Sequence, residues 1–210
     1  MNIFLTGGNG GIGKIISKQL KIANITVIEP TSKELNLNGS IDASNFPSVD
    51  GFIHCAGINP LCSHKDIDPK NLNQTFNINT FSFIDLCSKL KINNGGNIIA
   101  IGSIYANSVK ENRIQYTMSK HALYAAVKTI ALEISHRKIK VNMISPGFVD
   151  TNLTRKNNKE ERIKFLKENT PLGLVESIDI ANLCLFFIKN NNSITGQNIQ
   201  IDGGYSLKTI

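Results

Sequence analysis

A phenol and an ammonium group lie four residues apart in this chain, at Tyr116 and Lys120, and Ser103 lies thirteen residues upstream. On a helix, positions i and i+4 project from one face, so Tyr116 and Lys120 would share a site. The positive charge of Lys120 would favour the phenolate and draw the pKa of Tyr116 from about 10 toward neutrality. A phenol so placed suits reversible proton transfer to a carbonyl or alcohol oxygen, and the serine hydroxyl suits a fixed hydrogen bond to that oxygen.

A glycine-rich segment near the N-terminus is a second element that could bind a ligand. The apolar run at residues 3–5 predicts a buried strand, and the apolar spacing over residues 12–20 predicts a helix. Glycines between them would let backbone N–H groups approach a pyrophosphate at the positive end of the helix. A tight turn without a ligand is the alternative interpretation. The segment fits two registers, Gly8-x-Gly10-x-x-Gly13 and Gly7-x-x-x-Gly11-x-Gly13.

Taken in chain order, these motifs and several others resemble the short-chain dehydrogenase/reductase family over essentially the whole chain. The resemblance implies an NAD(P)-dependent oxidoreductase that interconverts a carbonyl and a secondary alcohol. The motifs are Thr6-Gly7-x-x-x-Gly11-Ile12-Gly13, Cys55-Ala56-Gly57, Asn77-Ile78-Asn79-Thr80, residues 96–103 ending in Ser103, Tyr116-x-x-x-Lys120, residues 141–147 followed by Thr151, and residues 194–197 with Asp202-Gly203-Gly204.

The resemblance assigns roles to four residues: Asn79, Ser103, Tyr116 and Lys120. Tyr116 would exchange a proton with the substrate oxygen, which Ser103 would hydrogen-bond. Lys120 would lower the pKa of Tyr116 and hold the nicotinamide ribose, and Asn79 would fix a water that links Lys120 to solvent. The expected cofactor-binding residues are Gly7, Asn9, Gly10, Gly11, Ile12, Gly13, Thr31, Ser32, Leu37, Cys55, Ala56, Gly57, Tyr116, Lys120, Pro146, Gly147, Val149 and Thr151.

The choice between NADP and NAD depends on the residues after the second strand. Alignment from the glycine turn places Thr31 at the cofactor ribose, followed by Ser32 and Lys33. Two hydroxyls and a cation suit a 2′-phosphate, so we expect NADP. A shift of two residues would instead place Glu29 there, and an acidic residue at the ribose favours NAD. NAD therefore stays the alternative.

Four departures from the family pattern carry structural expectations. Cys55 replaces an asparagine and so removes an amide that would tie two central strands together. Asn36 stands where an aspartate often meets the adenine. Gly102 replaces a serine that is frequent beside the catalytic one. The fourth departure is length. Only residues 38–50 join the third and fourth expected strands, so we expect the crossover helix there to be minimal or lost.

Alternating strand and helix patterns predict the fold class: a single-domain, doubly wound parallel α/β sheet of the Rossmann type, with helices on both faces and no second domain within 1–210. Ser177 is an expected helix N-cap. The charged segment 151–174 follows the Pro146-Gly147 turn, so we expect a lid over the carboxyl edge of the sheet rather than a merely exposed excursion. The expected strands are residues 3–5, 25–28, 35–37, 51–56, 97–101, 140–144 and 199–202, and the long helices are 71–92 and 115–136.

Composition narrows the functional class. Of 210 residues, 41% are hydrophobic and 19% charged, which is ordinary for one globular domain. The net charge of +7 is scattered among acids, which disfavours nucleic acid and leaves an anionic or carrier-bound substrate open. A core strand beginning at residue 3 and the lack of a long apolar run suggest no signal peptide and no membrane association. The four cysteines show no metal-ligand spacing, so we expect no metal and a reduced, cytoplasmic setting.

Assembly and substrate are the remaining expectations, and both follow from the resemblance. Relatives pair their two long helices across a two-fold axis, and the second helix here carries apolar residues on more than one side, so we expect a homotetramer or a dimer. Residues 170–173 and 194–197 resemble 3-oxoacyl-carrier-protein reductases; a sugar or polyketide-type ketone is the other substrate class. A dinucleotide-binding sensor or scaffold without turnover is the alternative function.

Overall fold

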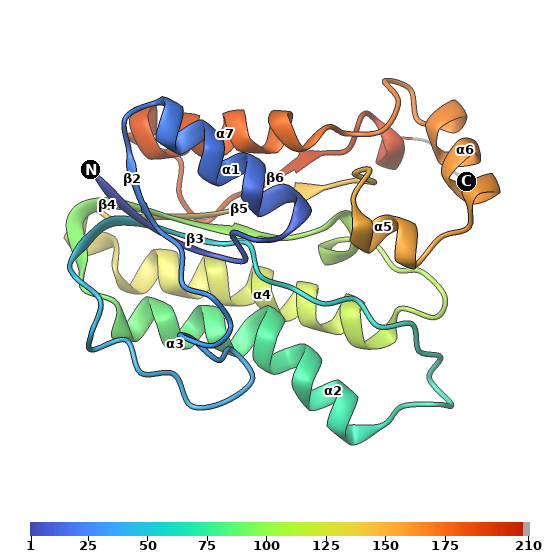
Figure 1. Cartoon of the computed structure of the whole chain (residues 1–210), viewed down its shortest axis with the longest axis horizontal. Coiled ribbons are helices and arrows are strands. Elements are labelled where there is room, and N and C mark those ends of the chain that lie inside the picture. Colours follow the sequence, from blue (N-terminus) through green and yellow to red (C-terminus); the bar gives the residue numbers. More distant parts are fainter. Residues whose placement is uncertain (208–210) are drawn as a thin grey trace.

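The structure is a computed structural model that describes residues 1–207. One sheet holds six parallel strands in the order β2-β1-β3-β4-β5-β6, which confirms the doubly wound fold (Figure 1). The order runs outward from β1 in both directions, so a ligand crevice is expected at the carboxyl ends of β1 and β3. The strands are β1 (Asn2–Thr6), β2 (Thr26–Ile28), β3 (Val49–His54), β4 (Ile92–Ile101), β5 (Lys140–Pro146) and β6 (Asn198–Ile201).

Helices cover both faces of this sheet. On one face α1 (Gly11–Ile22) packs against α7 (Ser177–Asn190), and on the other lie α2 (Pro69–Phe76), α3 (Ser82–Lys89) and α4 (Ile114–Glu133) (Figure 1). Two shorter helices, α5 (Asn152–Lys156) and α6 (Glu160–Asn169), form the segment expected to be a lid. Short 3₁₀ turns occupy residues 104–106, 135–137 and 205–207.

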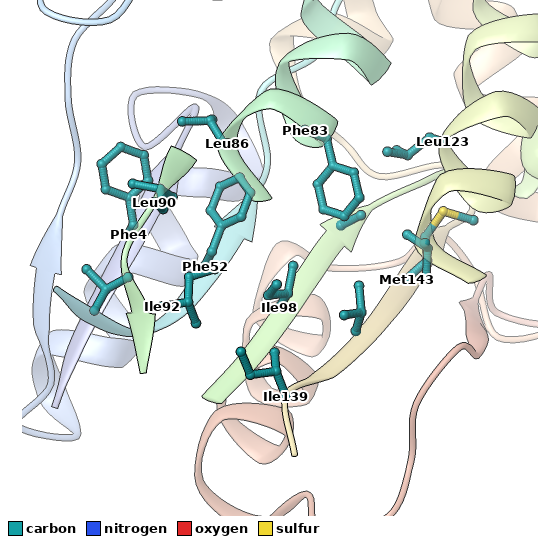
Figure 2. Packing of buried hydrophobic residues seen from close by; sticks show 14 of the residues in the cluster. Phe4, Phe52, Phe83, Leu86, Leu90, Ile92, Ile98, Leu123, Ile139 and Met143 are labelled. Atoms are coloured by element: carbon teal, nitrogen blue, oxygen red, sulfur yellow. The ribbon is translucent and has the colours of Figure 1, made fainter. Parts of the chain in front are cut away.

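Two apolar layers hold the sheet between these helices. Alternate residues of a strand point to opposite faces, so Phe4 enters one layer and Ile3 and Leu5 the other. In the first layer, the Phe52 ring centroid lies 5.9 Å from those of both Phe4 and Phe83 (Figure 2). The side chains at these positions are fully buried in both layers. This packing fixes where the strands that carry the site end.

The expected helix over residues 71–92 is interrupted. It begins after Asp68, whose carboxylate caps it, and a π-helical segment, η1 (Asn77–Phe81), separates α2 from α3. The helix ends at Lys89, and Ile92 already belongs to β4, so the predicted end was wrong. Insertions of this kind widen one turn and recur at functional sites.

The predicted strand at residues 35–37 does not form. Residues 29–48 contain neither helix nor strand, which confirms that the crossover helix is lost. The backbone instead turns about Asn36, whose side-chain oxygen accepts a hydrogen bond from the Asn38 N–H at 3.0 Å. Leu35 and Ile41 are buried in the first apolar layer, so this stretch covers the sheet edge without pairing with it.

Other element boundaries moved by a few residues. Strand β4 begins at Ile92 rather than at residue 97, with an irregular register against β3. Helix α4 ends at Glu133 rather than at residue 136. The predicted N-cap Ser177 was wrong: Glu176 caps α7 in a reciprocal capping box with Asp179. A carboxylate at this position satisfies the free N–H groups as a hydroxyl would.

The described residues also bear on membrane and thiol chemistry. Within residues 1–207, none of the helices combines the length and the apolar character that crossing a bilayer requires. All four cysteines are free; Cys62 and Cys184 are buried, and Cys55 and Cys87 are partly so.

Candidate active site

The glycine turn after β1 is built by backbone contacts that exclude side chains. Gly7 has φ +72°, and a Cβ there would lie 2.6 Å from the Ala56 nitrogen. A Cβ on Gly13 would lie 2.1 Å from the Gly7 oxygen. At Gly8 the nearest atoms belong only to the flexible side chain of Glu29. The geometry therefore favours the register Gly7-x-x-x-Gly11-x-Gly13, since Gly7 has no room for a Cβ whereas Gly8, the first member of the other register, meets only a flexible side chain.

A cavity of about 530 Å³ adjoins this turn at the crevice between β1 and β3. Its size and its backbone-rich wall fit the adenosine and pyrophosphate of a dinucleotide. Leu35, Asn36 and Leu37, from the irregular crossover, close its outer side. The expected cofactor residues on its wall are Gly7, Asn9, Gly10, Thr31, Ser32, Leu37, Cys55, Ala56 and Gly57.

A second cavity, of about 140 Å³, lies next to the first, because Cys55 and Gly57 line both. It brings together Ser103, Tyr116 and Lys120, the three residues from which proton chemistry was predicted. The expected cofactor residues on its wall are Ile12, Cys55, Gly57, Tyr116, Lys120, Pro146, Gly147, Val149 and Thr151. Three other predicted residues lie close by. Gly11 packs against Thr151, Gly13 packs against the backbone of Gly7, and Asn79 lies beside Gly57.

Lys120 is a buried ammonium group at the centre of this arrangement. Its side chain comes from α4, is 3% exposed, and donates from Nζ to the Ile101 carbonyl oxygen at 2.9 Å. The Nζ atom lies 5.7 Å from the centroid of the Tyr116 ring. Burial lowers the pKa of Lys120 to about 8, because charging the amine costs more away from water. The catalytic groups predicted from their i, i+4 spacing do share one face.

The pKa of Tyr116 moves in the direction opposite to the prediction. Burial raises it, and this effect outweighs the hydrogen bond with the Ser103 side chain and the positive charge of Arg113, both of which lower it. The effect was predicted to come from Lys120, but the groups that oppose burial are Ser103 and Arg113. Loss of hydration destabilises the phenolate more than these neighbours stabilise it.

Asn79 lies in the π-helical segment and holds a neighbouring loop. Its Oδ1 accepts from the Ile58 N–H at 2.8 Å, and its Nδ2 donates to the Ile58 oxygen and to Ser119 Oγ, both at 2.9 Å. The side chain is fully buried. These bonds fix the loop after β3 against α4, next to Gly57 and Lys120.

The tie between β1 and β3 that Cys55 removes is made by another side chain. The Thr6 hydroxyl lies 3.0 Å from His54 Nδ1 and accepts from the Ala56 N–H at 3.3 Å. His54 is fully buried, and burial lowers its pKa to about 3, which keeps it neutral. His54 thus helps to hold β1 and β3 together. Burial likewise raises the pKa of Cys55 to about 12.

Sequence reasoning missed several residues on the wall of the catalytic cavity, among them Arg113 and Phe148, and left Tyr105 undecided. Arg113 and Phe148 were not singled out, although Arg113 precedes Tyr116 by one helical turn, a spacing that gives a shared face. From the sequence alone Tyr105, two residues after Ser103, could either line the pocket or pack in the core. It lines the cavity and is buried, with its ring centroid 6.3 Å from that of Tyr116 and 6.5 Å from that of Phe148. Within residues 1–207, no three His, Cys, Asp or Glu side chains gather as a metal site would need.

Comparison with known proteins identifies the family. The profile of a family described as Enoyl-(Acyl carrier protein) reductase matches residues 40–206. The 3-oxoacyl-[acyl-carrier-protein] reductase FabG of Buchnera aphidicola subsp. Baizongia pistaciae is 31% identical, over 95% of both chains. The chain belongs to the short-chain dehydrogenase/reductase family. A short chain dehydrogenase family protein from Francisella tularensis has the same fold, with a TM-score of 0.87 and 29% identity over 99% of both chains.

Membership makes this chain an oxidoreductase that uses a nicotinamide dinucleotide. The solved structure of 4-hydroxyisoleucine dehydrogenase complexed with NADH is 25% identical, with a TM-score of 0.87 over 99% of both chains. The two neighbouring cavities agree with such a cofactor, because one adjoins the glycine turn and the other holds Tyr116 and Lys120.

The buried ammonium of Lys120 generates a pH prediction. Its pKa in the folded protein is about 8, below the usual 10.5, so the unfolded chain binds more protons between these values. The cost of burying the charge is therefore fully present below pH 8 and is relieved as pH rises toward 10.5. We expect wild type to gain about 3 kcal/mol of unfolding free energy relative to Lys120→Met over this range.

Denaturant unfolding of both proteins from pH 7 to 10.5 measures this gap. Lys128→Met, on the exposed side of the same helix, is the control and should show a constant gap. A constant gap for Lys120→Met as well would contradict burial as the cause of the shifted pKa.

Proposed function

We propose that this enzyme interconverts a ketone and a secondary alcohol with NADP. The observation that carries the proposal is the meeting of Ser103, Tyr116 and Lys120 in a small cavity that neighbours the cavity beside the glycine turn. The bound cofactor supplies hydride chemistry, and the protein supplies orientation and proton transfer.

The side chains divide the remaining work. The Tyr116 hydroxyl donates a proton to the substrate oxygen during reduction and takes it back during oxidation. The Ser103 hydroxyl hydrogen-bonds the same oxygen and, with the charge of Arg113, favours the phenolate form of Tyr116. Lys120, fixed by the Ile101 carbonyl, would hold the ribose of the nicotinamide. Asn79 holds the loop after β3 and keeps the floor of the cavity in place.

We also propose that the segment 151–174 closes over the substrate. Helix α6 is anchored by Ile163 and Leu166, both buried, whereas α5 follows the cavity residue Thr151 directly. Asn157, between the two helices, donates from Nδ2 to the Asn59 oxygen at 2.8 Å across the mouth of the cavity. Such a segment can exclude water from the reacting groups when substrate is present.

The similarity to 3-oxoacyl-[acyl-carrier-protein] reductases makes a 3-oxoacyl compound one candidate substrate. A sugar or polyketide-type ketone is the second. The alternative function is a sensor or scaffold that binds dinucleotide without turnover. The complete set of Asn79, Ser103, Tyr116 and Lys120 in one site argues against this alternative. Consumption of NADPH with a panel of ketones separates an enzyme from a sensor.

The first kinetic prediction concerns Tyr116→Phe. This change removes only the ionisable oxygen, so folding and dinucleotide binding should persist while kcat falls by roughly 10²–10⁴-fold. Tyr124→Phe, on the same helix but outside the cavity, is the matched control and should keep wild-type turnover. Steady-state kinetics with one ketone substrate measures the difference, and near wild-type turnover in Tyr116→Phe would overturn the assigned role.

Cofactor preference gives a second prediction, since Thr31 and Ser32 line the adenosine cavity whereas Glu29 does not. Glu29 directly follows β2 but pairs with Lys21. We expect NADPH to bind about 10- to 150-fold more tightly than NADH, as charged hydrogen bonds to a 2′-phosphate would give.

Titration of the protein with both nucleotides at low salt measures this preference. Thr31→Asp should invert it, because a carboxylate accepts hydrogen bonds from the ribose hydroxyls and repels a phosphate. Glu29→Gln is the control and should leave the preference unchanged. Tighter binding of NADH that Glu29→Gln reverses would show that Glu29, not Thr31, meets the ribose.

Assembly gives a third prediction. The helix layer of α2, α3 and α4 exposes apolar side chains on its outer side: Phe81 is 52%, Ile84 40% and Met118 45% exposed. We propose that a second subunit covers this face in a dimer or tetramer. Light scattering at micromolar concentration should give a multiple of 23.1 kDa. Met118→Glu should lower the measured mass of the particle. Ile22→Glu, at the end of α1, is the control and should not lower it. A monomeric wild type would refute the proposed assembly.

A further inference from the structure

Arg113 is a buried cation without an acidic partner. It is 6% exposed and lines the catalytic cavity. Of the five N–H donors of a guanidinium group, one donates to the Asn157 backbone oxygen at 3.5 Å, the long limit of a hydrogen bond. None of the ion pairs within residues 1–207 includes Arg113. A buried charge without a counterion is costly, so a ligand that supplies the counterion would bind here strongly.

The surroundings of Arg113 add positive charge instead of compensating it. Burial lowers the pKa of Lys110, and the nearby charges of Arg162 and Arg113 lower it further. The Lys110 Nζ atom lies 5.6 Å from the ring centroid of Phe148, on the wall of the same cavity. Neither Lys110 nor Arg162 takes part in an ion pair within the described chain. Three cations therefore lie close enough to repel one another, and Arg113 is the one of them that lines the cavity.

The backbone around Arg113 also favours an anion. Arg113 is the N-cap residue of the 20-residue helix α4, which has no side-chain cap and no acidic residue in its first turn. The N-terminus of a helix attracts negative charge through its free N–H groups. Tyr116 lies one turn further along, so a molecule with its anionic group at Arg113 would extend toward Tyr116 and Ser103.

The cavity has room for a small molecule beside Tyr116. Its volume is about 140 Å³. A short chain of carbon atoms with a carboxylate at one end and a ketone within it fills such a space. The thioester of a carrier-bound acyl chain is uncharged and would leave Arg113 without a partner.

We propose that Arg113 binds the carboxylate of a small oxo acid, or of the matching hydroxy acid, while the reacting oxygen lies at Tyr116 and Ser103. The planar guanidinium presents paired N–H groups that match the two oxygens of a carboxylate. This inference rests on the proposed function and narrows its substrate from ketones in general to free acids.

The test compares short oxo acids with their own methyl esters, which keep the ketone and remove the charge. In wild type, kcat/KM with NADPH should be about 10- to 150-fold higher for the acid than for its ester. Arg113→Gln should abolish this ratio, because it lowers the value for the acid about 10- to 150-fold more than the value for the ester; a loss common to both substrates reports the effect of Arg113 on Tyr116 instead. Arg113→Lys should restore part of the ratio. Lys128→Gln removes the same charge on the exposed side of α4 and should keep the wild-type ratio.

A binding measurement covers the case in which turnover itself is absent. A short hydroxy acid should raise the melting temperature of wild type and of Lys128→Gln, but not that of Arg113→Gln. Equal kcat/KM for acids and esters in wild type would overturn the role of Arg113 while leaving the reductase function intact. Absence of turnover with every ketone would refute the proposed function, and the melting shifts would then decide the carboxylate site alone.

Discussion

The site depends on holding the ammonium of Lys120 in the protein interior. Its one hydrogen bond in the structure goes to the Ile101 carbonyl, at the end of β4, so that strand must end at a fixed height beside α4. The two apolar layers on the faces of the sheet, one rich in aromatic residues and the other mainly aliphatic, fix the position of this strand end. The π-helical turn then brings Asn79 to the same point and fixes the loop after β3. The ammonium of Lys120, which burial disfavours, is thereby held on the wall of the smaller cavity.

The groups that favour ionisation of Tyr116 are not those that a tyrosine–lysine pair suggests. Burial disfavours ionisation of the Tyr116 phenol and raises its pKa, whereas Ser103 and Arg113 favour ionisation. Lys120 donates to the Ile101 carbonyl oxygen, and Arg113 lies one helical turn before Tyr116 on the wall of the same cavity. In the proposed function, Lys120 would serve the cofactor and Arg113 the substrate. This separation allows one to hold a ribose and the other an anionic substrate group.

Motifs whose residues interact over short sequence distances were predictable. The i, i+4 pair of Tyr116 and Lys120, the strand–turn–helix of Gly7 to Gly13 and the lost crossover helix followed from spacing and length alone. The direction of the Tyr116 pKa was not predictable, because it depends on burial by distant elements. Arg113 was accessible in principle from its spacing to Tyr116, but its lack of an acidic partner is a property of the folded chain. Leu35 and Leu37 have the composition of a strand, yet too few residues follow them to build a crossover.

The shortened crossover ties the fold to the ligand site. Because residues 29–48 form no helix, Leu35 and Ile41 cover the sheet edge, while Asn36 and Leu37 reach the adenosine cavity directly. The same short segment therefore serves as part of the core and as a wall of the site. Turns held by Asn36 and Glu34, rather than ladder hydrogen bonds, give it its shape. Deleting a helix here leaves the catalytic residues untouched, because β1, β3, β4 and α4 position them without help from this edge.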